Sequence, residues 1–472
     1  MGALTKRFVG DRAFYKRMLG IAIPVMVQVG ITNFVNLLDN VMVGQLGTEA
    51  MTGVSIANQL ITIFNLGIFG LVSGAGIFAA QFFGKGDMES LKHAFRFKIL
   101  GSLLVSILGI AVFLLFPEPL VSLYLKGEGD AAAIAHSLNV GKEYLLILLV
   151  GFLPFAVSQS YSSTLRETGN TVPPMIASMA AVFINLGLNY VLIFGHLGLP
   201  ALGARGAAIA TVISRYAEAL ILVVYTHKNT EKRPYAKGLY ASIRISGALF
   251  FLIFKKTLPL ITNEVLWALG ISLQAQCYSI HGYSVMSANS ISQTIYTVFS
   301  IAFAALGTAV GILVGQRLGA SDKEGAVDTF RKMAAFGVLV CIVIGGAMVL
   351  TAPLFPMLYK TDSEVNALAT AFIRIIGFCM PFTGYAHFCY YTVRSGGRTL
   401  LTFFFDSFYV CGFVVLLAYL LTGLGVSILP VFFFTHLTDL GKCIIGTLMI
   451  RSGAWIQNIT EHKQKKDCAS KQ

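Results

Sequence analysis

Twelve long apolar segments, separated by short polar breaks, occupy most of this 472-residue chain. A helix needs about 20 apolar residues to cross a hydrocarbon layer of about 30 Å, and every segment reaches that length. Only 12% of the residues are charged, whereas a soluble domain needs about 25% to cover its surface. The sequence therefore predicts an all-α integral membrane protein with 12 transmembrane helices. The segments lie near 18–45, 52–83, 98–118, 135–163, 173–196, 205–226, 255–280, 287–316, 333–358, 366–392, 399–421 and 427–450.

Basic residues are distributed unevenly between the two sides of this predicted bundle. Most of the 35 Lys and Arg residues lie in alternate breaks, for example Lys92 and Lys98 after the second segment. By the positive-inside rule this side is cytoplasmic, which predicts a multi-pass protein of the cell (inner or plasma) membrane with both termini inside. Topology and contact with anionic membrane lipids then explain the net charge of +13 without nucleic acid. The opposite breaks hold only Lys126, Arg205 and Lys360.

The two halves of the chain repeat each other. Residues 51–96 align with 286–331 without a gap, and about 14 of the 46 aligned positions are identical. A shorter match aligns 165–171 with 393–399. The repeat predicts two homologous six-helix lobes. The predicted divisions are an N-terminal lobe (1–226), a cytoplasmic linker with an interfacial segment (227–254), a C-terminal lobe (255–450) and a cytoplasmic tail (451–472).

The identical positions of the repeat include Gln81 with Gln316 and Gly84 with Gly319. Because six is an even number, both lobes enter the membrane from the same side, and an axis along the membrane normal is expected to relate them. Transporters of this construction bind substrate between the repeats near the bilayer midplane and rock one half against the other. The alternative is duplication without transport, as in a sensor or scaffold.

Polar side chains inside the apolar segments of the first lobe indicate a site. An ionisable group in hydrocarbon is costly and suggests function, and Asp39 lies in the first segment. Asn185 and Asn189 are four residues apart and share one helix face, while Thr211 and Tyr144 offer further oxygen atoms. We predict a cation-coupling site from these five side chains, with Asp39, Asn185 and Asn189 as candidate Na⁺ ligands. The alternative for the amides and hydroxyls is interhelical hydrogen bonding.

The second lobe carries a different set of polar side chains. At the repeat offset Asp39 corresponds to Gln274, so the first-lobe acid has no counterpart there. Glu264 and Asp406 are acids of the second lobe alone, and Trp267 lies one helical turn from Glu264. A carboxylate beside an aromatic face suits an organic cation. We predict a substrate cavity lined by Glu264, Trp267, Asp406 and Gln274, against the alternative that these residues only pack helices.

Two further charged pairs have the spacing of structural ion pairs on one helix. Arg215 and Glu218 are three residues apart, and so are Asp439 and Lys442. We expect both pairs to be intrahelical salt bridges.

No motif indicates an enzyme. The segment 84–87 (GKGD) lacks the spacing of a phosphate-binding loop, and no break is long enough for a nucleotide-binding domain. The eight histidines are dispersed, which disfavours a catalytic metal. The seven cysteines show no CxxC spacing and are interpreted as small apolar side chains. We expect no catalytic residues, no direct use of ATP and no cofactor beyond a coupling ion.

Six short motifs occur in order along the chain. They are Pro24 with 39–44 (DNVMVG), Arg166 with 169–171 (GNT), 185–190 (NLGLNY), 206–211 (GAAIAT), 263–267 (NEVLW) and 394–399 (RSGGRT). Together, on this repeat, they resemble the multidrug and toxic compound extrusion (MATE) family of the multidrug/oligosaccharidyl-lipid/polysaccharide superfamily. The resemblance extends from about residue 15 to residue 460.

The resemblance implies antiport, in which organic cations leave as H⁺ or Na⁺ enters. The family's first-helix acid falls on Asp39, and its first-lobe cation site falls on Asn185, Asn189, Thr211 and Tyr144. Position 189 is Asp in some members and Asn here, which leaves the choice of ion open. The family's seventh-helix acid often lies later after the proline than Glu264 does.

We therefore predict a secondary active multidrug antiporter that works by alternating access, binds small molecules and membrane lipids, and is monomeric. A lipid-linked oligosaccharide flippase of the same superfamily is the first alternative. It would need arginines lining the cavity to bind phosphates, and the segments contain few, chiefly Arg215 and Arg374. An intramembrane enzyme would need clustered acids, histidines or a metal at one depth, and the sequence shows no such cluster.

Overall fold

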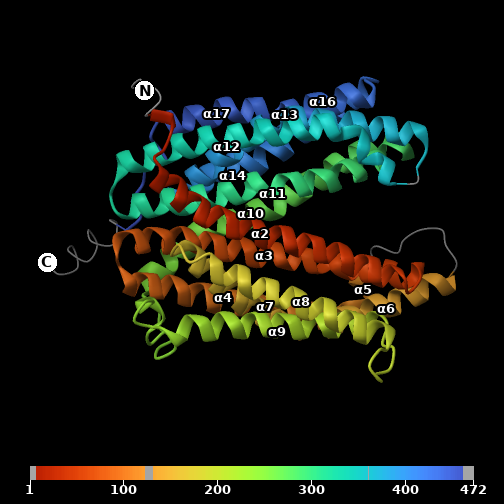
Figure 1. Cartoon of the computed structure of the whole chain (residues 1–472), viewed down its shortest axis with the longest axis horizontal. Coiled ribbons are helices and arrows are strands. Elements are labelled where there is room, and N and C mark those ends of the chain that lie inside the picture. The colour runs from red at the N-terminus through yellow and green to blue at the C-terminus, as the bar shows by residue number, and fades with distance from the viewer. Residues whose placement is uncertain (1–6, 123–130, 360, 461–472) are drawn as a thin grey trace. The chain divides into compact units, whose positions relative to one another are not determined.

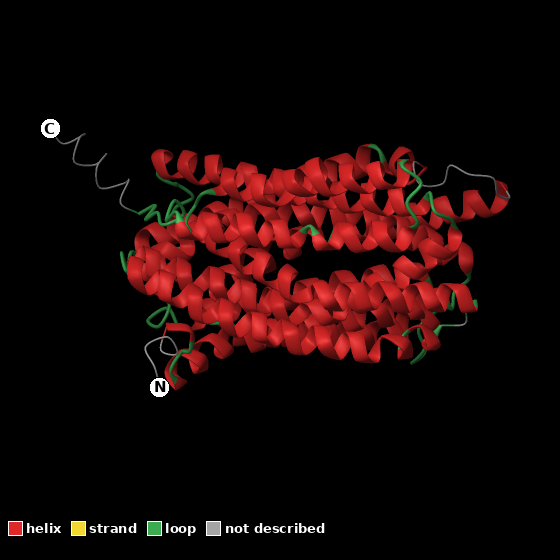
Figure 2. Cartoon of the chain, turned by 90° about the horizontal axis from the view of Figure 1, so that it is seen from above, coloured by secondary structure: helices red, strands yellow, loops and turns green. Residues whose placement is uncertain are grey.

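A computed structural model describes residues 7–122, 131–359 and 361–460 of the chain (Figure 1). Throughout these residues the secondary structure is helix joined by short loops, with no strand (Figure 2). Lys126, Lys360 and residues 461–472 of the predicted tail, including Cys468, lie outside the described residues. The prediction of an all-α membrane fold is confirmed.

The first half of the chain forms helices whose long apolar stretches account for the first six predicted spans. Val150 and Gly151 separate α6 from α7, which are bent by 53° and together are long and apolar enough for one span. The helices are α2 (Arg12–Gly44), α3 (Thr48–Lys85), α4 (Met88–Leu115), α5 (Pro117–Ser122), α6 (Ala131–Leu149), α7 (Phe152–Glu167), α8 (Val172–Phe194) and α9 (Ala204–Lys228), followed by the 3₁₀ turn η1 (Pro234–Ala236).

The second half of the chain begins with α10, a 33-residue helix that carries the polar side chains Asn263, Glu264 and Gln274. Among the described residues, ten helices are long and apolar enough to cross a membrane, and α10 is not one of them. Counting the bent α6–α7 pair as one span brings the number to eleven. The helices of this half are α10 (Gly247–Ser279), α11 (Tyr283–Gly319), α12 (Lys323–Thr351), α13 (Ser363–Ser395), α14 (Thr399–Phe403), α15 (Val415–Gly423), α16 (Ile428–Leu437) and α17 (Asp439–Arg451); the short segments are η2 (Ala352–Leu354), η3 (Pro356–Leu358), η4 (Phe404–Phe408) and η5 (Val410–Val414).

The chain divides into two compact units. The N-unit comprises Val27–Ala79 and Met88–Ile253, and the C-unit comprises Met1–Met26, Ala80–Asp87 and Phe254–Gln472. In the N-unit core, Phe64 and Phe152 stack at 4.0 Å between ring centroids. In the C-unit core, Phe372 and Phe432 stack at 3.9 Å. Aromatic stacking of this kind anchors helices whose outer faces remain apolar, as a lipid environment requires.

Residues that are identical in the two sequence repeats meet each other inside the C-unit. A Cβ atom added to Gly84, near the end of α3, would lie 2.7 Å from Cα of Gln316 on α11. A Cβ added to Gly319 would lie 2.6 Å from Cα of Gln81. Glycine is therefore required at both positions because the backbones approach too closely for any side chain. This reciprocal contact gives a physical reason for the identity of Gly84 and Gly319 in the repeat, since each meets the backbone of the other repeat's glutamine.

Replacing Gly84 by Ala is expected to destabilise the protein by about 1–3 kcal/mol, because backbone atoms of α3 and α11 must separate. The measurement is the midpoint of thermal unfolding of the purified protein in detergent. The matched control is Gly67→Ala on the same helix, where an added Cβ meets nothing within 4 Å and helix propensity alone favours Ala by about 1 kcal/mol. Equal midpoints for the two variants would contradict the close contact of the two backbones.

Candidate functional site

A chain of hydrogen bonds joins the polar side chains predicted for the first lobe, and all of it lies within the N-unit. Asp39 on α2 is half-buried and accepts a hydrogen bond from Nδ2 of Asn189 at 2.6 Å. Nδ2 of Asn189 also lies 3.2 Å from Oδ1 of Asn185, one turn earlier on α8. Nδ2 of Asn185 in turn donates to Oγ1 of Thr211 on α9 at 3.3 Å. The structure therefore brings Asp39, Asn185, Asn189 and Thr211 together from three helices.

Tyr144 on α6 is buried and close enough to Asp39 for the two groups to interact electrostatically. Asn185 and Asn189 are also buried, with 6% and 1% of their surfaces exposed. The site thus places one carboxylate, two amides and two hydroxyls in a region largely closed to solvent. Carboxylate, carbonyl and hydroxyl oxygens are the ligands of hard cations, and a carboxylate in such a place can also hold a proton.

A second cluster of charged side chains lies within the C-unit. Glu264 on α10 forms an ion pair with Arg394 on α13 at 4.0 Å. Asp406 forms an ion pair with Lys442 on α17 at 3.0 Å. Asn263, the neighbour of Glu264, connects the two pairs, since its Nδ2 lies 3.2 Å from Oδ2 of Asp406. The two acids predicted for the second lobe therefore belong to one network, in which each carboxylate faces a basic side chain.

The backbone around Asp406 is π-helical over η4 and η5. Insertions of this kind inside α-helices often occur at functional sites because they shift side chains out of regular register. Oγ of the neighbouring Ser407 lies 2.6 Å from the backbone oxygen of Asn263 and 2.8 Å from Oδ1 of the same residue, and its one hydroxyl hydrogen serves both acceptors. The irregular segment therefore attaches directly to α10, beside Glu264.

The other two side chains predicted for the substrate cavity lie apart from this network. Trp267 is 41% exposed on α10. Gln274 donates from Nε2 to the hydroxyl of Tyr278 at 2.7 Å, and this hydroxyl lies 2.7 Å from Oγ1 of Thr435. Gln274 is thus placed in a helix-packing contact between α10 and α16, and Trp267 keeps an exposed face.

The prediction of intrahelical salt bridges between Arg215 and Glu218 and between Asp439 and Lys442 is wrong. Lys442 pairs with Asp406, while Asp439 accepts a hydrogen bond from Thr383 at 2.6 Å. The guanidinium of Arg215 lies 4.9 Å from the ring centroid of Phe155. Glu218 accepts a hydrogen bond from Ser178 at 2.5 Å. For Glu218, Asp439 and Lys442, a residue outside their own helix supplies a closer partner than the residue three positions away.

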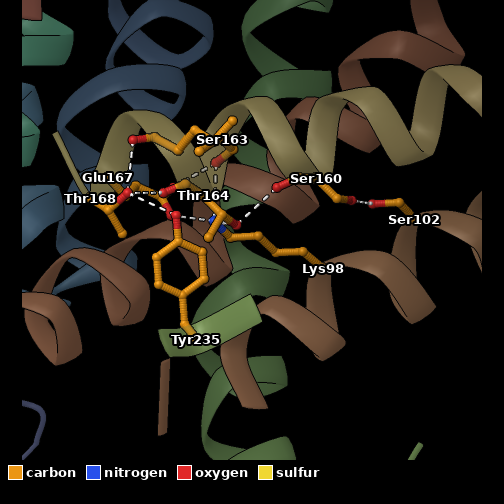
Figure 3. A network of polar contacts seen from close by, with 9 residues as sticks. Lys98, Ser102, Ser160, Ser163, Thr164, Glu167, Thr168 and Tyr235 are labelled. Carbon is orange, nitrogen blue, oxygen red and sulfur yellow. Dashed lines mark hydrogen bonds and ion pairs between the residues drawn. The ribbon is translucent and has the colours of Figure 1, made fainter. Parts of the chain in front are cut away.

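Lys98, predicted to lie at the cytoplasmic membrane surface, is instead completely buried on α4 (Figure 3). Its Nζ forms an ion pair with Glu167 on α7 and lies 3.1 Å from Oγ of Ser163 and 3.3 Å from Oγ1 of Thr164. Ser163 donates to the other oxygen of the Glu167 carboxylate at 2.6 Å. The three donors of the ammonium group thus have three partners, which is the condition under which a buried charge is tolerated.

The same network reaches the segment that follows α9. Oγ1 of Thr168, next to Glu167, lies 3.4 Å from the hydroxyl of the buried Tyr235 in η1 (Figure 3). Arg96 on α4 donates to the backbone oxygens of Leu239 at 2.8 Å and Gly238 at 3.0 Å. The predicted linker is therefore held against α4 and α7. In the sequence, the position of Lys98 at the start of an apolar run is the one signal that pointed to burial.

These features define a class of protein: an all-helical, multi-pass membrane protein with an internal repeat and with ionisable clusters inside its spans, as in membrane transporters. The MatE family model matches residues 24–191 and 259–420. The two matched regions begin 235 positions apart, which is the offset of the repeat. The chain therefore belongs to the MatE family of transporters.

Curated relatives and solved structures are similar over nearly the whole chain. The probable multidrug resistance protein NorM of Thermotoga maritima is 25% identical over 388 residues, 82% of this chain and 81% of the relative. The probable multidrug resistance protein YoeA of Bacillus subtilis is 24% identical over 414 residues, 86% of this chain and 87% of the relative. The outward-facing structure of a multidrug resistance MATE transporter of the MOP superfamily has a TM-score of 0.83 at 17% identity, covering 96% of this chain and 98% of that one.

Proposed function

We propose that this protein is a secondary active multidrug efflux antiporter that exports small organic cations in exchange for H⁺ or Na⁺. The observation that carries the proposal is the position of Asp39, whose carboxylate accepts a hydrogen bond from Nδ2 of Asn189 in a chain of amide and hydroxyl groups. A group of this kind can alternate between a cation-bound and a cation-free state. The names of the relatives, which are multidrug resistance proteins, support the choice of substrate class.

Coupling requires that the ion and the substrate favour opposite conformations of the transporter. In the proposed cycle, H⁺ or Na⁺ at Asp39 favours release of substrate to the outside, and loss of the ion to the cytoplasm restores the state that binds substrate. Glu264 and the exposed face of Trp267 are proposed to contact the organic cation. The protein is proposed to act as a monomer in the cell membrane, with both termini cytoplasmic.

The test is efflux of a fluorescent organic cation from proteoliposomes that contain the purified protein. A pH gradient and a Na⁺ gradient are imposed separately, and each is then collapsed with an ionophore. We expect efflux above that of protein-free liposomes with one gradient, and loss of that efflux when the gradient is collapsed. Absence of gradient-driven efflux for every organic cation tested would refute the antiport proposal and favour a lipid or anionic substrate, as in the flippases of the superfamily.

A further inference from the structure

A long groove runs along the C-unit between α12 and α17, with α13 as its floor. It has a volume of about 1420 Å³. α13 packs against both α12 and α17, and the three helices lie in neighbouring positions in Figure 1. The groove is lined mainly by apolar side chains, among them Ile342, Phe378 and Leu440, which are more than 40% exposed. It is therefore an apolar surface that no described part of the C-unit covers.

Glycines line the groove on α12 and α13. Gly345 on α12 and Gly377 on α13 let these helices approach so closely that a Cβ on Gly377 would lie 2.8 Å from the backbone oxygen of Gly345. The adjacent Gly346 also lines the groove, and a Cβ there would meet nothing within 4 Å. The groove is thus open beside Gly346.

The charged residues that line the groove are all basic. They are Arg7, Arg331 and Arg451, and the lining contains no acidic side chain among the described residues. None of the three arginines forms an ion pair with another described residue, whereas the nearby Lys332 pairs with Asp328 at 2.6 Å. The groove therefore carries three positive charges that the described part of the chain does not neutralise.

The three arginines lie at the same end of the groove. Arg331 is in the first turns of α12, and Arg451 is the last residue of α17. The segment after α17 returns to the start of α12, because Asn458 donates to Oγ of Ser321 at 2.9 Å. Arg7 completes the set from the N-terminal segment. The groove is thus basic at one end and apolar along the rest of its length.

We propose that this groove binds an anionic phospholipid, with its phosphate at the arginines and an acyl chain along α12 and α13. Guanidinium groups bind phosphate oxygens in a bidentate manner, and basic pockets between transmembrane helices bind anionic headgroups. From Arg331 to Leu350 the groove follows α12 for roughly 28 Å at a rise of about 1.5 Å per residue, which is about the thickness of the hydrocarbon layer. An anion without an acyl chain would leave the apolar part of the groove, between Arg331 and Leu350, uncovered.

The experiment measures binding of phosphatidylglycerol and phosphatidylethanolamine to the full-length protein in neutral detergent by native mass spectrometry. The variant carries Arg7→Gln, Arg331→Gln and Arg451→Gln. We expect it to bind phosphatidylglycerol roughly 100-fold more weakly than the wild type, since each basic residue contributes about fivefold to binding an anionic lipid. Phosphatidylethanolamine is expected to bind weakly to both proteins.

The matched control removes the same charge from lysines at and beyond the end of α9, with Lys228→Gln, Lys232→Gln and Lys237→Gln. This control is expected to retain phosphatidylglycerol binding. An equal loss in both triple variants would show a general charge effect and would overturn the proposal. Displacement of the bound lipid by excess inorganic phosphate would also overturn it, because it would reveal an anion site without a lipid chain.

A second variant tests the apolar part of the groove without changing charge. Gly346→Leu places a side chain in the open space and is expected to weaken phosphatidylglycerol binding about tenfold, the equivalent of about two lost methylene contacts. The control is Gly423→Leu, a helical position at the end of α15 where an added Cβ also meets nothing within 4 Å. Undiminished binding by Gly346→Leu, with the fold intact by thermal unfolding, would contradict the proposed path of the acyl chain.

Discussion

Replacing Asp39 by Asn is expected to abolish gradient-driven efflux while leaving the protein folded. The variant keeps an oxygen that can accept the hydrogen bond from Asn189, which the native carboxylate accepts at 2.6 Å. The free energy of unfolding should therefore change by no more than about 1 kcal/mol, the usual net contribution of one hydrogen bond. The variant loses the negative charge and with it the ability to release and take up a proton or to attract Na⁺.

The measurement is efflux from proteoliposomes under the gradient that drives the wild type, together with the midpoint of thermal unfolding. The matched control is Glu49→Gln, which removes an exposed carboxylate from the first turn of α3 and is expected to transport normally. Full transport by a well-folded Asp39→Asn protein would disprove the proposed coupling role. Loss of transport in both variants would point to net charge as the cause.

Replacing Lys98 by Met is expected to have the largest effect on stability. The substitution leaves the Glu167 carboxylate, on the neighbouring helix α7, without its basic partner at a buried position. Removing one member of a buried ion pair typically costs about 3–5 kcal/mol. We expect a lower midpoint of thermal unfolding and a smaller yield of folded protein after solubilisation.

A double variant separates this ion pair from general packing. At the repeat offset Lys98 corresponds to Met333, which is itself buried in the C-unit. A methionine therefore fits the equivalent place in the second repeat. Adding Glu167→Gln to Lys98→Met removes the uncompensated charge and is expected to recover most of the lost stability.

The matched control is Lys92→Met, on the same helix as Lys98. Lys92 pairs with Glu89, whose side chain is 77% exposed, and an exposed pair contributes only about 0–1 kcal/mol. Similar unfolding midpoints for Lys92→Met and Lys98→Met would show that burial of the Lys98–Glu167 pair has no energetic consequence. If Glu167→Gln does not restore the stability of Lys98→Met, the lost stability comes from packing of the Lys98 side chain and not from the unpaired carboxylate.

Much of the fold could be predicted from the sequence because membrane helices are specified locally. A continuous apolar run of bilayer length has few alternatives to a helix in hydrocarbon, where every backbone group needs an internal partner. The repeat could also be recognised, and the contacts of Gly84 and Gly319 give a physical reason for one of its identities. α10 has a weaker signal than the ten helices that are long and apolar enough to span a membrane, because Asn263, Glu264 and Gln274 reduce its apolar character.

Part of the candidate site could also be predicted from the sequence. Asp39 stands out as an acid in an apolar run, and the spacing of Asn185 and Asn189 places both amides on one face of α8. Helical periodicity, however, relates only residues three or four positions apart. The predicted salt bridges Arg215–Glu218 and Asp439–Lys442 were wrong for this reason, since Glu218 contacts Ser178 and Lys442 contacts Asp406, both outside their own helices.

By itself, the sequence determined that the chain is a helical membrane protein with two repeats and with an acid in its first span. These properties follow from composition and from short-range pattern. Only the tertiary structure decided which base faces which acid. Lys98 and Glu167 are separated by 69 residues, and Asp406 and Lys442 by 36. The packing of helices sets such contacts, because a buried charge is stabilised by the partner that a neighbouring helix places beside it.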